Sequence, residues 1–201
     1  MIAVVFDVDG TLVLSDEMDA RLYVTAVRSV LGEVRLRDSW ERYENVTDSA
    51  ILEDICTDNQ IALTAQIIRG IKARFVADIG RHIQDSGPFQ EFPGARDFVL
   101  SLIHSHQCRV AYATGGWGES ARLKLASAGL PLNVPLASSD DFSNRSAIMT
   151  HALSQIGRDF AKISYYGDGP WDREAAISMG WEFVPVGKEL GGLSKFAVGG
   201  A

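Results

Sequence analysis

The chain has 201 residues, of which 46% are hydrophobic, and its formal net charge is −7 at pH 7. This length and apolar content allow a sizeable core, which excludes an intrinsically disordered protein. The negative charge argues against nucleic acid as a partner, because surfaces that bind nucleic acid usually carry a basic stripe.

The sequence contains no signal that predicts secretion or membrane insertion. The N-terminus lacks the basic region and cleavage site of a secretory signal, and its apolar run stops at Asp7, far short of a membrane span. Cys56 and Cys108 have neither metal-knuckle nor disulfide-framework spacing and are expected to be reduced thiols. We therefore expect a cytoplasmic protein with no membrane partner and no obligate protein partner.

The first predicted element is a strand, followed by a long helical segment. The β-branched run "IAVVF", residues 2–6, is typical of a buried parallel strand. From residue 16 to residue 83 the apolar residues have helical spacing, with Ser, Thr and Asp at plausible helix starts. An insertion of about 70 residues is too long for an ordinary loop between a strand and a helix. We therefore predict that residues 15–87 form a small helical cap.

From residue 88 onward, predicted strands and helices alternate along the chain. The expected helices cover residues 95–106, 118–130, 146–157 and 172–180, and the expected strands cover residues 109–114, 133–137, 162–167 and 181–186. This alternation predicts an α/β fold with a Rossmann-like, doubly wound parallel sheet, which the first strand joins. The predicted core is thus residues 1–14 and 88–201, with a Gly-rich end that is expected to fray.

Polar side chains follow three of these predicted strands directly. They are Asp7, Asp9, Thr114, Asp168 and Asp172. The ligand crevice of a parallel sheet lies at the carboxyl ends of its strands, so these side chains should lie close together. Four carboxylates in one crevice repel one another unless a cation is bound, and Mg²⁺ prefers such oxygen ligands and bridges to phosphate. The sequence therefore predicts a magnesium site.

Further residues suggest that the same edge binds a phosphoryl group. Thr114 and the following glycine, Gly115, offer a hydroxyl and backbone amides at the start of a helix, and Arg145 could add a positive charge. A metal, an anion cradle, a cation and a carboxylate nucleophile together indicate phosphoryl transfer. Each motif alone has a simpler explanation: a DxD pair is often a solvated turn, and GDxxxD can cap a helix. Their order after successive strands favours a functional site.

These motifs resemble those of the haloacid dehalogenase-like hydrolase superfamily. Its first motif, DxDGT, matches residues 7–11, its second motif is similar to Thr114 in "YATGG", and its fourth motif, GDxxxD, matches residues 167–172. The similarity extends over the whole chain and includes a helical cap inserted after the first motif.

The resemblance implies a two-step reaction through an aspartyl-phosphate. It implies that Asp7 is the nucleophile and that Asp9 protonates the leaving group and then activates water. Thr114 would hydrogen-bond the phosphoryl oxygens. Mg²⁺ would be held by Asp7, the backbone carbonyl of Asp9 and Asp168, with Asp172 as a ligand or a support.

The third motif of the family usually supplies a lysine, which the segment "SSDDFSNRSAIM" lacks. Arg145 is in the expected place, and the family tolerates arginine there. Lys162 is the competing residue, but it begins a predicted strand and would lie at the wrong end of the sheet. We therefore expect Arg145 to fill this role.

The resemblance favours phosphate-ester chemistry, since dehalogenases and phosphonate-cleaving relatives lack the carboxylate found here at Asp9. The predicted function is a Mg²⁺-dependent phosphatase that acts on a small phosphorylated metabolite. A phosphomutase of the same superfamily stays open as an alternative. An alternative from another class is a non-catalytic protein that binds a phospho-ligand or acts as a phospho-switch. A receiver-type switch would have no helical insertion after its first strand and no GDxxxD, and the intact Asp7, Asp9, Thr114 and Asp168 argue against a binding protein that has lost its activity.

The cap is expected to select the substrate, and its polar turn "YENVTDS" contains the best candidates. Asn45, Thr47 and Asp48 could face the active site, although an ordinary turn with Thr47 or Asp48 as a helix cap explains them equally well. Trp117 and Trp171 flank two motifs and are more often packing residues than pocket walls. The four histidines are not expected to bind metal.

Overall fold

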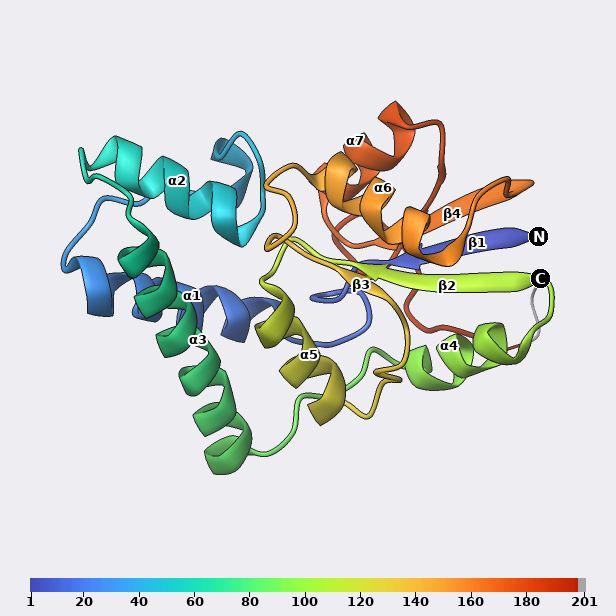
Figure 1. Ribbon diagram of the computed structural model, residues 1–201. Coiled ribbons are helices and arrows are strands. Elements are labelled where there is room, and N and C mark those ends of the chain that lie inside the picture. The colour runs from blue at the N-terminus through green and yellow to red at the C-terminus, as the bar shows by residue number, and fades with distance from the viewer. Residues whose placement is uncertain (199–201) are drawn as a thin grey trace.

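A five-stranded parallel sheet lies at the centre of the computed structural model, which describes residues 1–198 (Figure 1). Its strands are β1 (Ile2–Phe6), β2 (Cys108–Ala113), β3 (Leu136–Ala137), β4 (Lys162–Gly167) and β5 (Glu182–Pro185). Their order in the sheet is β3-β2-β1-β4-β5, so the chain winds outward from β1 in both directions. The predicted α/β, doubly wound fold is confirmed, and its crevice lies where the winding reverses.

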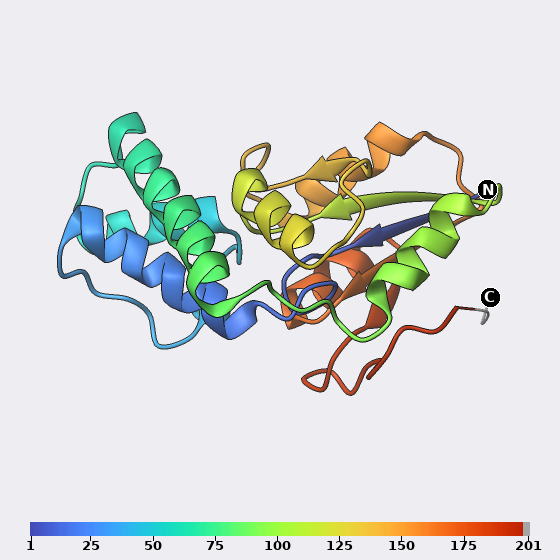
Figure 2. The same cartoon turned by 90° about the horizontal axis from the view of Figure 1, so that it is seen from below.

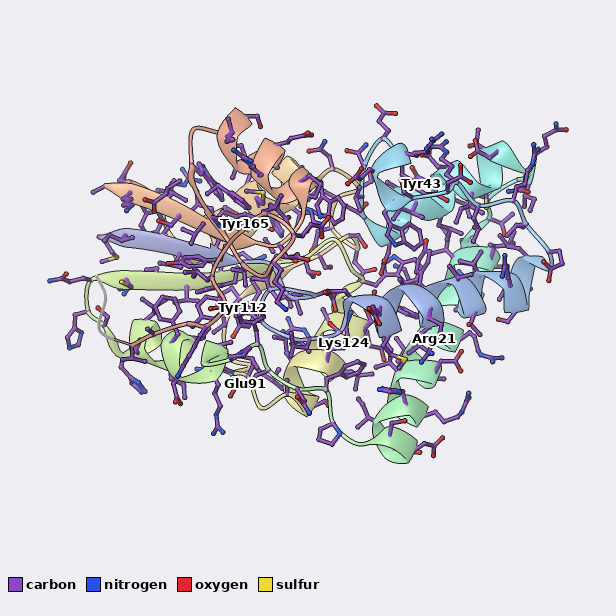
Figure 3. All side chains as sticks on the ribbon, turned by 180° about the vertical axis from the view of Figure 1, so that it is seen from behind. Arg21, Tyr43, Glu91, Tyr112, Lys124 and Tyr165 are labelled. Carbon is purple, nitrogen blue, oxygen red and sulfur yellow. The ribbon has the colours of Figure 1, made fainter. Side chains whose placement is uncertain are left out.

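Two helices cover each face of the sheet. Figure 1 shows α4 (Ala95–His104) and α5 (Gly118–Ser127) on one side and α6 (Arg145–Ile156) and α7 (Pro170–Ser178) on the other. Successive strand residues point to opposite faces, so Tyr112 on β2 and Tyr165 on β4 enter different apolar clusters (Figure 3). Both faces are buried, which explains why the strands are continuously apolar.

The helical insertion lies beyond one end of the sheet (Figure 2). It contains α1 (Asp16–Leu31), a short 3₁₀ helix η1 (Trp40–Arg42), α2 (Asp48–Asp58) and α3 (Ala65–Ser86). The side chains of Thr47 and Thr64 accept hydrogen bonds from backbone amides three residues later and so cap α2 and α3. All of these helices lie within residues 15–87, and we retain the division of the chain into a cap and a core as a proposal.

The strand expected at residues 133–137 is much shorter than predicted. Only Leu136 and Ala137 form β3 at the sheet edge, although the carbonyl of Pro135 still accepts a hydrogen bond from Tyr112. Proline has no backbone N–H and cannot donate to a neighbouring strand, which limits regular pairing there. Residues 199–201, the end of the tail that was expected to fray, lie outside the described residues. Within residues 1–198, no helix is both long enough and apolar enough to cross a membrane.

Candidate active site

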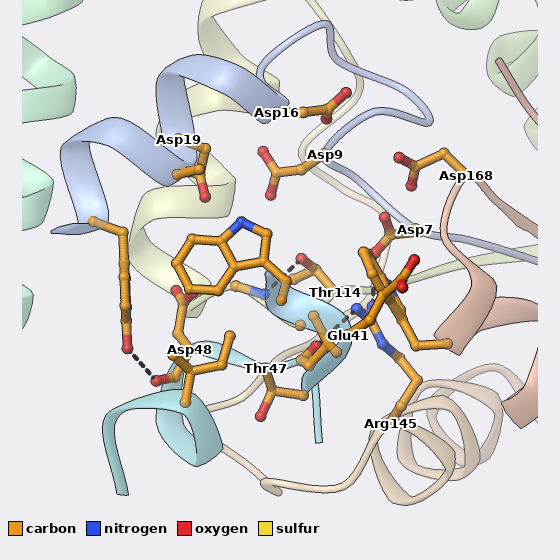
Figure 4. Close-up of a pocket in the computed structure, with 18 of the residues that line it drawn as sticks. Asp7, Asp9, Asp16, Asp19, Glu41, Thr47, Asp48, Thr114, Arg145 and Asp168 are labelled. Atoms are coloured by element: carbon orange, nitrogen blue, oxygen red, sulfur yellow. Dashed lines mark hydrogen bonds and ion pairs between the residues drawn. The ribbon is translucent and has the colours of Figure 1, made fainter. Parts of the chain in front are cut away.

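The polar residues that follow β1, β2 and β4 meet at one edge of the sheet. Phe6 is in register with Tyr112 on β2 and with Tyr166 on β4, so the three chains leave the sheet at nearly the same level. Asp7, Thr114 and Asp168 consequently line one cavity of about 430 Å³ between the sheet and the helical insertion (Figure 4). The carboxyl ends of the parallel strands thus bring these three residues together, as expected for an open α/β sheet.

The turn after Asp9 depends on a glycine. Gly10 has a φ of +71°, a conformation that residues with a Cβ atom rarely adopt. A Cβ atom at this position would also overlap the carboxylate of Asp168. The Gly in the DxDGT motif therefore allows the loop after β1 to pass close to the loop after β4.

Three carboxylates at this edge fit a divalent cation. Asp7, Asp168 and Asp172 each offer an oxygen, and the three oxygens lie within 4.8 Å of one another. Burial, followed by repulsion from Asp172, raises the pKa of Asp7 well above its usual range, and the same two causes raise the pKa of Asp168 to about 8. A hard cation such as Mg²⁺ would relieve this repulsion, so the donor set suits it.

Asp172 and Asp9, which complete the predicted metal set, have further contacts. Asp172 is fully buried, accepts hydrogen bonds from the Tyr165 hydroxyl and the Gly169 amide, and caps the start of α7. It therefore acts both as the helix cap and as a member of the acidic group. The Asp9 side chain is not part of this acidic group, and its Oδ1 accepts a hydrogen bond from the Ser15 hydroxyl.

These pKa values predict that the metal-free protein is less stable at pH 8 than at pH 6. Carboxyl pKa values above the unfolded value of 3.8 mean that the folded state binds more protons than the unfolded state in this range. The free energy of unfolding then falls as the pH rises. Mg²⁺ competes with these protons, so it should raise the melting temperature more at pH 8 than at pH 6, by several degrees.

Thermal unfolding at both pH values, with Mg²⁺ and with chelator, checks this prediction. Asp168→Asn is the informative variant, since it should flatten both the pH dependence and the Mg²⁺ effect. The exposed Asp97→Asn serves as a control that should change neither. A metal-free protein that melts higher at pH 8 than at pH 6 would contradict the prediction.

Arg145 supplies the positive charge nearest to Asp7. It is the first residue of α6, and its Nη1 donates to Asp7 Oδ1 at 3.0 Å and lies 3.4 Å from Asp172 Oδ1. Its Nη2 donates to the carbonyl of Val46 in the helical insertion, whereas its buried Nε has no partner among the described residues. A buried cation with an unused donor beside a carboxylate is suited to hold an anionic group there.

The "TGG" turn lies against Arg145 and the insertion. Thr114 is buried, and its hydroxyl oxygen accepts a hydrogen bond from the Gly116 amide, which is therefore not a free donor as the sequence suggested. The Trp117 amide is also occupied, because it donates to Asp48. A Cβ atom on Gly115 would lie 2.6 Å from Arg145 Nη2 and 2.8 Å from the Val46 carbonyl, so only glycine fits this contact.

Sequence reasoning missed a buried lysine that contacts Asp9. Lys124 of α5 has no exposed surface, and its Nζ lies 2.6 Å from Asp9 Oδ1 and 2.5 Å from Asp19 Oδ1 on α1 (Figure 3). Burial lowers its pKa, but the two carboxylates outweigh that effect and raise it. Lys124 occupies the same face of α5 as Ala121 and Leu125, so a lysine on a predicted apolar helix face was the available signal.

Replacing Lys124 by Met should destabilise the protein by about 3–5 kcal/mol, because it leaves two buried carboxylates without their cation. Chemical denaturation measures this loss. Lys72→Met is the matched control: the Lys72–Asp140 pair also joins the insertion to the core, but both side chains are about one-third exposed. Its loss should cost about 1 kcal/mol or less. Equal destabilisation by the two substitutions would show that the buried cation is not structurally important.

The three cap residues chosen from the sequence lie in different places. Thr47 and Asp48 line the cavity, whereas Asn45 lies outside it and accepts a hydrogen bond from Asn144. Thr47 both caps α2 and donates to the carbonyl of Ser143. The Asp48 carboxylate accepts from the Trp117 amide at 2.8 Å, so the first turn of α2 is attached directly to the core.

The other residues singled out from the sequence differ in whether they line the cavity. Trp117 is almost fully buried and packs against Tyr23 and Phe75, whereas Trp171 lines the cavity. Lys162 is half exposed at the start of β4, where it pairs with Glu182. None of the four histidines, His82, His104, His106 and His151, lines the cavity.

The fold and the site together define an α/β protein with an acidic, metal-compatible crevice beneath a helical insertion. A family model for haloacid dehalogenase-like hydrolases matches residues 1–180. The chain therefore belongs to the haloacid dehalogenase-like hydrolases, as its motifs predicted. No curated protein matches the chain.

Solved structures with similar folds include phosphate-handling proteins. A hydrolase from Pseudomonas syringae has a TM-score of 0.72 at 19% identity, over 92% of this chain and 84% of its own. CbbY from Rhodobacter sphaeroides, solved with phosphate, has a TM-score of 0.69 at 21% identity, over 96% and 87% of the two chains. A β-phosphoglucomutase from Clostridium difficile has a TM-score of 0.71 at 16% identity, over 94% and 86%. These likenesses show the shared fold.

Proposed function

We propose that this protein is a Mg²⁺-dependent phosphatase that hydrolyses a small phosphorylated metabolite through an aspartyl-phosphate on Asp7. The observation that carries the proposal is the setting of Asp7. Its carboxylate is buried, contacts Arg145 on one side and belongs to the acidic group with Asp168 and Asp172 on the other. A carboxylate that attacks phosphorus needs positive charge nearby, since the phosphoryl oxygens are negative. Arg145 supplies this charge on one side of Asp7, and a Mg²⁺ held by the acidic group would supply it on the other.

In the first step, a carboxylate oxygen of Asp7 attacks phosphorus and the bond from phosphorus to the ester oxygen breaks. Asp9 is suited to protonate that oxygen. Its Oδ1 is held by Ser15 and Lys124, while its Oδ2 faces the "TGG" turn, within 3.5 Å of the place that a Cβ of Gly116 would occupy. The other carboxylate oxygen is thus free to present a proton at the cavity.

In the second step, water attacks the phosphorus of the aspartyl-phosphate. Asp9 takes the proton from this water, the bond from phosphorus to Asp7 breaks, and inorganic phosphate leaves. Thr114, Gly115 and Arg145 would hold the phosphoryl oxygens in both steps. Mg²⁺, held by Asp7, Asp168 and the Asp9 carbonyl with Asp172 in support, supplies charge neutralisation when it is bound.

Phosphate release from a panel of phosphorylated metabolites and a generic aryl phosphate tests the proposal. We expect release that requires Mg²⁺, stops with chelator and returns when Mg²⁺ is restored. Conversion of a sugar phosphate to its isomer without net phosphate release would instead identify a phosphomutase. Binding of phosphate esters with no turnover would contradict both activities.

A further inference from the structure

The part of the cavity that would hold the leaving group is strongly acidic. Beyond the phosphoryl end, the carboxylates that line it are Asp19, Glu41, Asp48 and Glu189, whereas Asp16 lies beside Asp168 at the metal end. Among the described lining residues, Arg145 is the only lysine or arginine, and its guanidinium is engaged with Asp7. The positive charge of the cavity is therefore confined to the end where the phosphoryl group would bind.

Asp48 lies where the first atoms of a leaving group would pass. It is 92% buried, and one of its oxygens lies 3.7 Å from the place that a Cβ of Gly116 would occupy. An Asp9 oxygen lies 3.5 Å from the same place, so the two carboxylates border the same small volume (Figure 4). A group attached to the ester oxygen protonated by Asp9 would thus meet Asp48 directly.

Lys124 offsets part of the negative charge of this region, because it pairs with Asp19 and partly opposes the burial that raises the pKa of Asp48. Lys124 is fully buried, does not line the cavity and already contacts both Asp9 and Asp19. Within residues 1–198, neither Asp48 nor Glu41 has a basic side chain within 4.0 Å. Burial, followed by repulsion from Asp19, raises the pKa of Asp48 well above its usual range. A cation in the cavity would relieve this repulsion.

Aromatic rings complete this wall. Tyr23 and Trp40 line the cavity with their ring centroids 6.2 Å apart, and Trp171 lines it as well. Aromatic faces beside carboxylates favour organic ammonium groups, which both kinds of side chain attract. A second phosphate or a carboxylate would meet like charge instead, which is strongly unfavourable in a buried site.

Resting on the phosphatase function above, we propose that the substrate is a phosphate monoester whose leaving group carries a protonated amine, such as an amino alcohol or an amino sugar. The cavity, at about 430 Å³, is in the lower part of the usual range for small-molecule sites and suits a short chain or a single ring. CbbY from Rhodobacter sphaeroides has been solved with xylulose-1,5-bisphosphate. In this chain, Arg145 is the only Lys or Arg among the described lining residues, and it lies at the phosphoryl end, so a second phosphate would meet carboxylates.

Glucosamine 6-phosphate and glucose 6-phosphate have the same ring and differ in charge, and 6-phosphogluconate is an open-chain acid of similar size. Glucosamine 6-phosphate carries an ammonium, glucose 6-phosphate is neutral at that position, and 6-phosphogluconate adds a carboxylate. Phosphoethanolamine, ethyl phosphate and phosphoglycolate repeat the comparison at smaller size. We expect kcat/KM at pH 7 with Mg²⁺ to favour the amine by about tenfold over the neutral ester and about a hundredfold over the acid in at least one series.

Two substitutions test the residues that carry the proposal. Asp48→Asn should reduce the amine-to-neutral ratio of kcat/KM to about one, and Glu41→Gln should reduce it by a smaller factor. Glu41 is exposed, so its variant decides the matter if Asp48→Asn fails to fold. Glu44→Gln is the matched control, because Glu44 is exposed and lies three residues after Glu41 but outside the cavity, and it should keep the wild-type ratio.

The outcomes distinguish this proposal from the activity on which it rests. Mg²⁺-dependent turnover that favours neutral or acidic esters would overturn the ammonium proposal and leave the phosphatase function standing. An amine preference that survives both Asp48→Asn and Glu41→Gln would also overturn it. No Mg²⁺-dependent release from any ester, the aryl phosphate included, would overturn the proposed function itself.

Discussion

Asp7→Asn should abolish phosphate release, with a fall in kcat of at least about 10⁴-fold, while the protein stays folded. An amide cannot replace the carboxylate as nucleophile, and loss of a nucleophile typically has an effect of this size. Folding should survive because the substitution removes one charge from a group of carboxylates that repel each other, and it leaves an oxygen that can accept from Arg145. Steady-state phosphate release and thermal unfolding measure the two effects.

The control for this variant is Asp97→Asn, which makes the same chemical change on the exposed surface of α4. It should leave kcat at the wild-type value and, because Asp97 is in the first turn of α4, lower the melting temperature by no more than a few degrees. If Asp7→Asn kept a kcat within about tenfold of wild type, Asp7 would not be the nucleophile. If the variant were unfolded, the loss of activity would carry no information, so the melting curve is part of the same measurement.

Arg145→Met should lower kcat/KM by about 10²–10³-fold or more, which is the usual effect of removing one preorganised charge from a transition state. The methionine side chain fills similar volume but cannot donate to the phosphoryl oxygens, to Asp7 or to the Val46 carbonyl. Arg145→Lys should recover part of the loss in kcat/KM, because lysine restores the positive charge but cannot make the bidentate hydrogen bonds of a guanidinium.

Lys162→Met is the matched control for Arg145, since Lys162 was the competing cation in the sequence. Its side chain is half exposed at the opposite end of β4 and pairs with Glu182. Kinetic assays should find kcat/KM within about twofold of wild type for this variant. A larger loss for Lys162→Met than for Arg145→Met would reverse the assignment of the third-motif cation.

The site residues that could be predicted from the sequence are those whose positions follow from the order of the strands and helices. Asp7, Thr114 and Asp168 each follow a strand, and parallel strands deliver their C-terminal ends to one edge, so their proximity could be predicted from the order of elements. Arg145 could be placed in the same way, as the first residue of a helix that follows β3. The family likeness and the fold class were therefore available before any coordinates.

The features of the site that were not predicted depend on how the helical insertion packs on the core. Local sequence patterns do not specify this packing. Lys124 meets Asp9 and Asp19 because α5 lies against the start of α1. Asn45 lies outside the cavity and Asp48 lies inside it, although they are three residues apart in one turn. The acidic wall itself comes from separate segments, with Asp19 on α1, Glu41 on η1 and Glu189 after β5. The Lys124 ion pairs and the acidic wall both arise from contacts between segments that are far apart in the sequence.

The most direct test of the account is to trap the phosphorylated enzyme. An Asp9→Asn variant, which lacks the base for the second step, would be mixed with an aryl phosphate and Mg²⁺, quenched in acid and digested for mass spectrometry. The account predicts a phosphoryl group on Asp7, and none when chelator is present or when Asp7 is also replaced by Asn. Phosphate release by the wild type with no phosphorylation of Asp7 in either protein would contradict it.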